Sequence, residues 1–233
     1  MPLRWYGRVL VLSLAAVGGS GAAFAAPSAD PLDTVMGRMD QAAASFKGLT
    51  ANIQKVSHTD VVNVNDTDNG TIVVKKYKPG DTRIRIDFAA PRQQNVAIGG
   101  GKAVVFKPVT NEAQEVDLGK SRGIVDQFML LGFGSNSSEL KSAYSVTMGG
   151  TDTVNGEKTT RILLVPKDKE VLAHVKRCEL WISEKGWTVQ QKFYTDDKDY
   201  VLSTYSHMNF GAVIADKDVK LDLPKGLKVT KLK

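Results

Sequence analysis

The residue types that most often carry chemistry are scarce in this sequence. It holds one cysteine, Cys178, and three histidines, His58, His174 and His207. A nucleophilic thiol needs a base beside it, and none of these histidines forms a recognisable motif with the cysteine. The G-x-S-x-G motif of serine hydrolases is absent as well. Cys178 stands in the apolar stretch RCELWIS, so we interpret it as a small buried residue that has no disulfide partner.

Carboxylates cluster in the stretch TDDKD, where Asp196, Asp197 and Asp199 stand close together. Such a group can act on a glycosidic bond or bind calcium. The same composition between two apolar runs is also typical of a solvated hairpin turn, which we favour. We therefore expect no enzyme activity, no cofactor and no metal site, and keep a hydrolase as a rival hypothesis.

The first 25 residues have the pattern of a secretory signal peptide. Arg4 and Arg8 precede the short apolar run VLVLSLAAV, and an A-x-A cleavage pattern ends at Ala25. The alternative is an uncleaved membrane anchor, which needs about 20 apolar residues. No cysteine lies near the cleavage site, where it could carry a lipid anchor. We expect cleavage near Ala25 and export of residues 26–233 to the periplasm as a soluble chain.

The charge of the chain is mildly positive, at +6, and its lysines are scattered. Nucleic acid is a poor partner for this pattern, since no dense basic patch alternates with aromatic residues. Solvated strand faces and the basic C-terminal stretch KGLKVTKLK account for the lysines. Weak attraction to anionic lipid headgroups is the alternative.

The elements that would position a site begin with one helix. Asp30 can cap it, Pro31 suits its first position, and Gly48 ends it. Apolar residues recur at helical spacing along one face. They are Leu32, Val35, Met36, Met39, Ala43 and Phe46.

Most of the remaining chain predicts strands. In TRIRIDF (82–88), Ile84, Ile86 and Phe88 alternate with charged residues, which is the pattern of a strand with one apolar face. About eleven such stretches follow one another through turn signals such as Gly99-Gly100-Gly101. No repeat or linker divides them. We predict a single mainly β domain of the α+β class over residues 26–233, built on a large, strongly bent antiparallel sheet.

The alternation breaks between residues 122 and 144. A short, very apolar helix that ends at the glycines of GFG is predicted here, followed by a second small helix. We expect the first helix to plug or cover the bent sheet as a lid. Its apolar residues are Ile124, Phe128, Met129 and Leu131.

A sheet of this width has an apolar face that must cover something. A curled sheet of about eleven strands can enclose more volume than its own side chains fill, so we predict a hydrophobic cavity. The alternative is that the helical segments fill this volume completely. The residues expected to line the cavity and bind a ligand are Ile72, Val74, Ile84, Ile86, Phe88, Val96, Ile98, Val104, Phe106, Leu180 and Ile182.

The order of these parts resembles a known family. The helix ends in F.GL.A...Q, from Phe46 to Gln54, and G.I.VKK..P...RIDF..P follows from Gly70 to Pro91. V..GG.....F.P...Q comes next, and F.....D......LPKGLKV closes the chain from Phe210. This arrangement is similar to the LolA-like family of periplasmic outer-membrane lipoprotein carriers, whose relatives include LolB, LppX and the amino-terminal domain of RseB.

The resemblance implies an unclosed antiparallel β-barrel with a helical lid that holds the acyl chains of a lipoprotein. Such carriers receive lipoproteins from an inner-membrane ABC transporter and pass them to an outer-membrane acceptor, without a cofactor. We expect a monomeric soluble carrier. A carrier or sensor of other lipids and an adaptor that binds protein through a sheet edge remain as alternatives.

The resemblance also implies a latch that holds the lid closed. In the family, an arginine of the strand motif KRP bonds to the lid. This sequence reads VVKKYKPG at that place, so the candidate latch residues are Lys76 and Lys78, with Arg83 and Arg85 as substitutes. An ammonium group lacks the forked geometry of a guanidinium, so a lysine latch would differ from the arginine latch.

Overall fold

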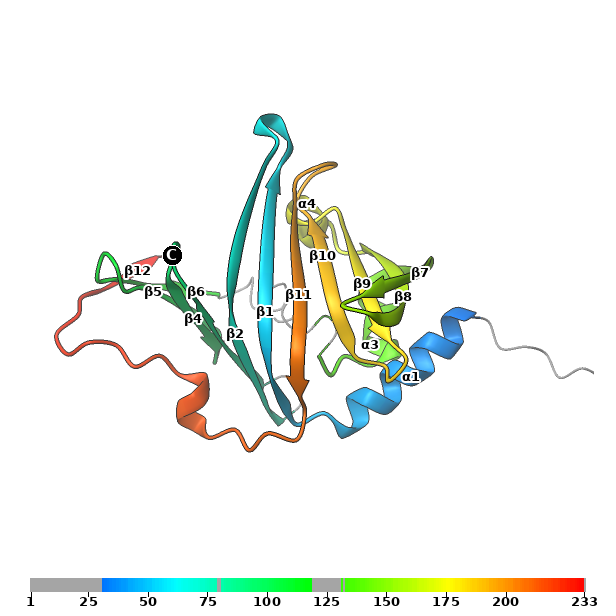
Figure 1. Cartoon of the computed structure of the whole chain (residues 1–233), viewed down its shortest axis with the longest axis horizontal. Coiled ribbons are helices and arrows are strands. Elements are labelled where there is room, and N and C mark those ends of the chain that lie inside the picture. The colour runs from blue at the N-terminus through cyan, green and yellow to red at the C-terminus, as the bar shows by residue number, and fades with distance from the viewer. Residues whose placement is uncertain (1–30, 79–80, 119–130, 132, 233) are drawn as a thin grey trace, which may run out of the picture.

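The computed structural model describes residues 31–78, 81–118, 131 and 133–232. One twelve-stranded sheet dominates this part of the chain (Figure 1). Its strands are β1 (Gly48–Thr59), β2 (Val64–Lys78), β3 (Asp81–Phe88), β4 (Gln94–Gly99), β5 (Lys102–Lys107), β6 (Glu112–Asp117), β7 (Tyr144–Val154), β8 (Glu157–Pro166), β9 (Arg177–Ser183), β10 (Thr188–Tyr194), β11 (Tyr200–Asn209) and β12 (Val229–Leu232). Their order is β12-β6-β5-β4-β3-β2-β1-β11-β10-β9-β8-β7, and the two edges do not pair with each other. The predicted unclosed, curved sheet is confirmed.

Nearly all neighbouring strands are antiparallel, as expected for strands joined by tight turns. The exception is β12, which the sequence analysis did not predict. It runs parallel to β6, with Val229 opposite Ala113. The chain reaches this edge through a long segment after β11 that contains the short 3₁₀ helix η3 (Asp216–Val219) and passes below the sheet in Figure 1.

Three described α-helices accompany the sheet: α1 (Pro31–Ser45), α3 (Ser137–Ala143) and α4 (Lys169–His174). The predicted amphipathic stripe of α1 is confirmed, because Val35, Met36 and Met39 are buried. They pack on Ile162 and Leu180 of the sheet. We call the face of the sheet that carries these two residues the inner face, and the opposite one the outer face.

Polar contacts fix α1 against its neighbours. Asp40 of α1 accepts hydrogen bonds from the backbone nitrogen and the hydroxyl of Ser137, both at 2.6 Å, and so ties α1 to the start of α3. The turn between β9 and β10 approaches α1 at Gly186, whose φ is +83°. A side chain there would collide with the Arg38 carbonyl oxygen, so this approach requires glycine.

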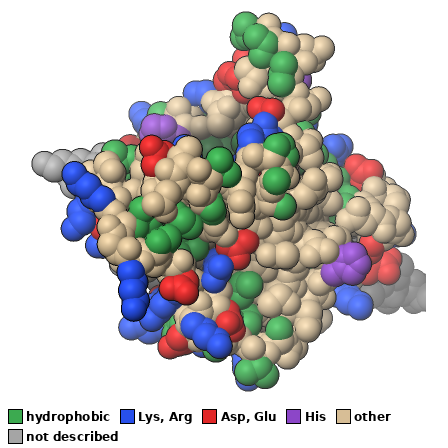
Figure 2. Space-filling model, turned by 60° about the vertical axis from the view of Figure 1, so that its left-hand side comes forward, with side chains coloured by type: hydrophobic (Ala, Val, Ile, Leu, Met, Phe, Trp, Pro, Cys, Tyr) green, Lys and Arg blue, Asp and Glu red, His purple; other side chains and the backbone are tan. Residues whose placement is uncertain are grey.

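The hairpin β1–β2 projects beyond the rest of the sheet (Figure 1). Its turn contains the 3₁₀ helix η1 (Asp60–Val62) and Asn63 at φ +49°. The strand β2 runs through Asn69-Gly70, although this dipeptide is a common turn signal. Val61 and Val62 at the turn are 92% and 65% exposed, and Figure 2 shows apolar side chains at the end of the projection.

Candidate functional site

The inner face of β1, β2 and β3 carries a large apolar cluster. Cross-strand pairs place Ile72 opposite Ile86 and Val74 opposite Ile84, so their side chains share one face. Phe46, at the end of α1, and Phe133 pack on this cluster. Its buried members are Phe46, Leu49, Ala51, Ile53, Ile72, Val74, Ile84, Ile86, Phe88, Phe133 and Tyr205.

A second apolar cluster lies on the same face over β8 and β9. Ile162, Leu180 and Ile182 have no exposed surface and pack with Met36 and Met39 of α1. Cys178 belongs to this cluster, and burial raises the pKa of its thiol well above the usual range. The thiol therefore stays protonated and acts as an apolar residue, in agreement with the interpretation of the sequence.

Most residues that the sequence predicted to line a cavity lie on the inner face. Ile98 is buried there, and Val96 is partly buried and packs on the first cluster. The prediction needs a correction for β5. Val104 pairs with Ala97 and Phe106 with Asn95, which places both side chains on the outer face. The inner residues of β5 are Ala103 and Val105.

A polar stripe on β10 and β11 separates the two clusters. Thr188, Gln191 and Ser203 are all buried on the inner face. Gln191 Nε2 donates a hydrogen bond of 2.6 Å to the hydroxyl of Tyr205. Gln191 Oε1 and Thr188 Oγ1 have no hydrogen-bond partner in the described part of the molecule. Buried polar atoms without partners are costly, so this stripe is a place where a polar group of a ligand would be stabilised.

The end of the predicted lid inserts at both clusters. Leu131 is buried in the second cluster and Phe133 in the first, where its ring meets Tyr205 edge-on at a centroid distance of 4.9 Å. Ile124, Phe128 and Met129 lie outside the described residues. Leu131 and Phe133 themselves each pack on one of the two apolar clusters of the inner face.

One of the candidate latch residues lies beside this segment. Lys76 lies on the inner face and lines a hollow of about 380 Å³ together with Asp40, Phe133, Gly134 and Asn136. Gly134, at φ +86°, turns the chain over the ring of Phe46 at this point. Lys76 is therefore the candidate that can reach the foot of the predicted lid.

The other candidates lie elsewhere, which corrects the expectation for both arginines. Arg85 is on the outer face, where it pairs with Asp87 at 2.9 Å and donates to the Lys220 carbonyl oxygen at 3.0 Å. Arg83 is on the same face and stacks over the ring of Tyr77 at 4.4 Å. Lys78 is exposed at the end of β2.

A charged network borders the first cluster on the inner face. Asp68 is 8% exposed and binds Lys55 at 2.9 Å and Arg92 at 2.7 Å. Burial acts to raise the pKa of Asp68, but the hydrogen bonds from Lys55 and Arg92 outweigh it and hold the pKa below its usual value. The Lys55 ammonium also lies 4.8 Å from the ring centroid of Phe88. Sequence reasoning missed this network, because its members come from separate strands.

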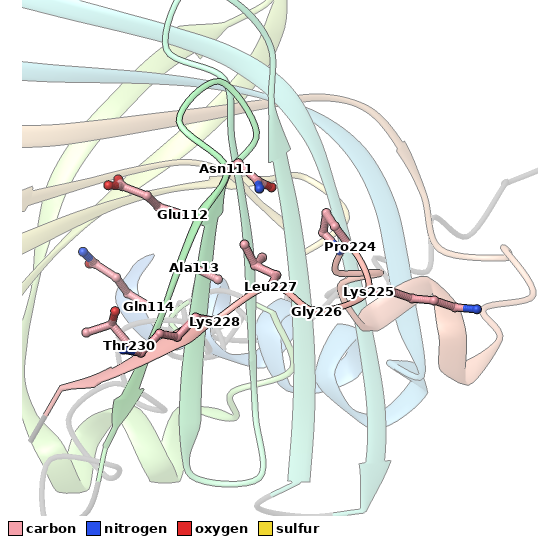
Figure 3. Close-up of a pocket in the computed structure, with 10 residues that line it drawn as sticks. All are labelled: Asn111, Glu112, Ala113, Gln114, Pro224, Lys225, Gly226, Leu227, Lys228 and Thr230. Carbon is pink, nitrogen blue, oxygen red and sulfur yellow. The ribbon is translucent and has the colours of Figure 1, made fainter.

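A hollow of about 390 Å³ lies between β6 and residues 224–230 (Figure 3). Ala113 and Leu227 meet at its floor, whereas Glu112 and Lys225 point in opposite directions. Binding sites need polar groups that converge on a ligand. This hollow therefore marks where the C-terminal segment joins β6.

No group of three or more His, Cys, Asp and Glu side chains within the described residues is arranged to hold a metal ion. The Asp196 carboxylate accepts the backbone N–H groups of Lys198 and Asp199, as in a hairpin turn. None of the helices within the described ranges is long and apolar enough to cross a membrane.

No protein-family model matches the chain, and no curated protein sequence matches it. Several solved structures match its fold. The crystal structure of MucB superposes with a TM-score of 0.52 and 16% identity, over 84% of this chain and 64% of that one. The chain thus spans about two thirds of MucB. An uncharacterized conserved protein from Thermus thermophilus gives 0.52 and 10%, over 87% of this chain and 100% of that one.

A LolA superfamily protein from Nitrosomonas europaea also matches, with a TM-score of 0.40 and 13% identity over 81% of this chain and 97% of that one. At these identities the comparisons establish architecture. The chain shares the fold of MucB and of the Thermus protein, and its unclosed, curved sheet is the architecture that was expected from the sequence.

Proposed function

We propose that this chain is an exported carrier that binds acyl chains on the apolar inner face of its sheet. The observation that carries the proposal is the pair of buried apolar clusters on an unclosed sheet, with Leu131 and Phe133 of one short segment inserted into them. A segment with this placement can be displaced by a ligand of the same chemistry. The interaction is non-directional and accepts apolar chains of different length.

The energetics suit a carrier that must also release its ligand. Each buried methylene contributes about 0.8 kcal/mol, so a few of them already give measurable binding. Displacing Leu131 and Phe133 costs part of this gain, because their own burial is lost. The net affinity is therefore moderate, and return of the segment favours release.

The proposed cargo is the acyl part of a lipoprotein. We propose that the carrier moves it through the periplasm from an inner-membrane ABC transporter to an outer-membrane acceptor. The signal-peptide pattern and the LolA-like motifs of the sequence support this role. Binding needs no bond to be made or broken, so no catalytic residue belongs to the proposal.

The test is a titration of the delipidated protein with a triacylated cysteine peptide, a fatty acid and the same peptide without acyl chains. We expect a rise in Tm and a bound mass in native mass spectrometry for the two acylated probes only. Phe133→Ala should strengthen binding of the acylated probes, because it removes a side chain that competes for the inner face. Val213→Ala, at a fully exposed position, should leave binding unchanged. If neither acylated probe raises the Tm, the carrier function is refuted.

A carrier or sensor of other lipids is the second candidate, and the polar stripe favours it. Gln191 Oε1 and Thr188 Oγ1 can receive a polar group that lies between two apolar chains. Stronger binding of the fatty acid than of the triacylated peptide would select this candidate over the lipoprotein carrier.

A further inference from the structure

The outer face of the central strands carries ordered rows of uncharged polar side chains. The first row crosses four strands and the second lies beside it on two. In the first row, Asn69, Gln54, Thr204 and Gln190 stand side by side on β2, β1, β11 and β10. In the second row, Asn52 on β1 stands opposite Ser206 on β11. None of these side chains is charged, although charged residues make up 24% of the chain. Below the projecting hairpin in Figure 2, the surface is largely tan, which marks uncharged polar side chains and backbone.

A folded-over hairpin makes this face concave. The turn of β7–β8 lies over the outer face, where Asn155 Nδ2 donates to the Tyr205 carbonyl oxygen at 3.3 Å. Trp181 Nε1 holds the same hairpin through Asp152 Oδ2 at 3.1 Å. Hollows of about 490 and 570 Å³ lie along the hairpin, and Asn155 and Ser206 line both. We call these two hollows together the amide groove.

Aromatic rings close one end of the amide groove. Trp187 and Phe210 stack with a centroid distance of 3.9 Å and an angle of 18°, and both line the larger hollow. Both rings are partly exposed. An exposed aromatic surface beside polar groups suits a ligand that has both apolar and polar faces.

The side chains of the groove offer donors and acceptors together. Gln54 Nε2 donates to Asn69 Oδ1 at 3.1 Å, which leaves Gln54 Oε1 as an acceptor and Asn69 Nδ2 as a donor on neighbouring strands. Adjacent hydroxyl groups of a sugar both donate and accept, so they can bridge such a pair.

Other classes of ligand fit less well. A phosphate or nucleic acid would need several cations, but the rows contain none, and the larger hollow is lined by one lysine, Lys185, together with the acidic Glu157. A peptide strand would need a free sheet edge, but β1 is paired on both sides, with β2 and β11. We propose that the amide groove binds a neutral oligosaccharide, with its hydroxyl groups on the amide rows and one sugar ring against Trp187 and Phe210. The amide rows lie on the opposite face from the two apolar clusters, whereas Trp187 and Phe210 also pack on Phe46 of the first cluster. The proposal does not depend on the carrier function.

The experiment is an NMR titration of the full chain with maltotetraose, cellotetraose and tetra-N-acetylchitotetraose at millimolar concentrations. We expect at least one of them to shift the side-chain amide signals of Gln54, Asn69 and Asn155 and the indole signal of Trp187. Gln54→Ala and Asn69→Ala should each weaken binding about fivefold, as loss of one hydrogen-bonding group does. Asn155→Gly removes the amide and preserves the turn, whose φ of +50° glycine accepts.

Asn65→Ala is the matched control. It removes an exposed amide from β2, on the same face as Asn69 and about 13 Å away from it. It should leave the Kd unchanged, and all variants should keep the Tm of the parent protein. The absence of shifts with all three oligosaccharides overturns the proposal. Binding with an unchanged Kd in Gln54→Ala, Asn69→Ala and Asn155→Gly overturns it as well, because the sugar would then bind elsewhere.

Discussion

On β1 and β11, adjacent residues serve two unlike surfaces. Ile53 and Tyr205 are buried in the first cluster, where the ring of Phe133 meets Tyr205. Gln54 and Thr204, each one position away on the same strands, lie on the outer face. The inner surface can bind by excluding water, and any apolar chain of suitable size satisfies it. At Gln54 and Thr204, the outer surface can bind through directed hydrogen bonds. Strand alternation thus lets one thin sheet present two kinds of recognition without a second domain.

The largest expected difference between the faces is in stability. Leu180→Ala should lower the free energy of unfolding by about 3 kcal/mol, because Leu180 has no exposed surface and its removal leaves a cavity. Thr204→Ala on the outer face should change it by less than about 0.5 kcal/mol. Urea unfolding of both variants measures this. Equal effects would contradict the assignment of the inner face as the core.

A smaller effect is expected at the border of the inner face. Asp68→Asn should lower the free energy of unfolding by about 1–2 kcal/mol at neutral pH, because the charged hydrogen bonds to Lys55 and Arg92 are weakened. The pKa of Asp68 is depressed from its ordinary value of 3.8. The difference between parent and variant is therefore complete above pH 4 and disappears as the pH falls through the lower pKa of the folded state.

Unfolding curves between pH 2 and pH 7 measure this loss. Asp33→Asn is the control, since Asp33 pairs with Lys141 at an exposed site and should contribute little. A difference that stays constant down to the lowest pH would exclude the charged network as its cause.

A substitution in the polar stripe should raise the stability of the protein instead of lowering it. Thr188→Val keeps the shape of a fully buried side chain and removes an oxygen that has no partner in the described structure. We expect the free energy of unfolding to rise by up to about 1 kcal/mol. Uptake of a polar lipid should weaken at the same time. A loss of stability would mean that Thr188 Oγ1 has a partner in solution, such as bound water.

The smallest effect is expected where the C-terminal segment crosses the outer face. Asp216 accepts hydrogen bonds from Lys75 Nζ at 2.7 Å and Tyr77 Oη at 2.6 Å. These contacts lower the pKa of Asp216 to about 2. The stabilising effect of these contacts is therefore fully present above pH 4 and is lost as the pH approaches 2.

Asp216→Asn should loosen the segment at neutral pH and speed tryptic cleavage after Lys217 and Lys220, with little change in Tm. Asp222→Asn is the control on the same segment. Equal cleavage rates in parent and both variants would show that Asp216 does not anchor the segment.

Sequence patterns were sufficient for the fold and for most of the inner face. The alternation of Ile84, Ile86 and Phe88 identified the face correctly, because each polar neighbour is charged and excludes the opposite assignment. The stretch KAVVFK has apolar residues on both faces, so Val104 could not be assigned by alternation. The two-residue turn at Gly100 and Gly101, both with positive φ, sets the register, and three consecutive glycines conceal it.

The non-local features could not be predicted from local patterns. The strand β12 pairs with β6 across more than a hundred residues, and its short sequence carries no signal for its partner. The polar stripe of Thr188 and Gln191 interrupts an otherwise apolar surface, although both residues read as ordinary members of a strand. The amide groove depends on the hairpin β7–β8 folding over the sheet, where Asn155 contacts Tyr205, 50 residues further along the chain.

The two open edges of the sheet bear on self-association. An unclosed barrel exposes backbone groups that could pair with a second copy of the chain. At one edge, β12 is only four residues long and carries the exposed Lys231. At the other, a bulge at Gly149 breaks the regular pairing of β7. Neither edge offers a long, flat template for fibre growth. The sheet can therefore remain unclosed, with its inner face accessible to a ligand, and still resist aggregation.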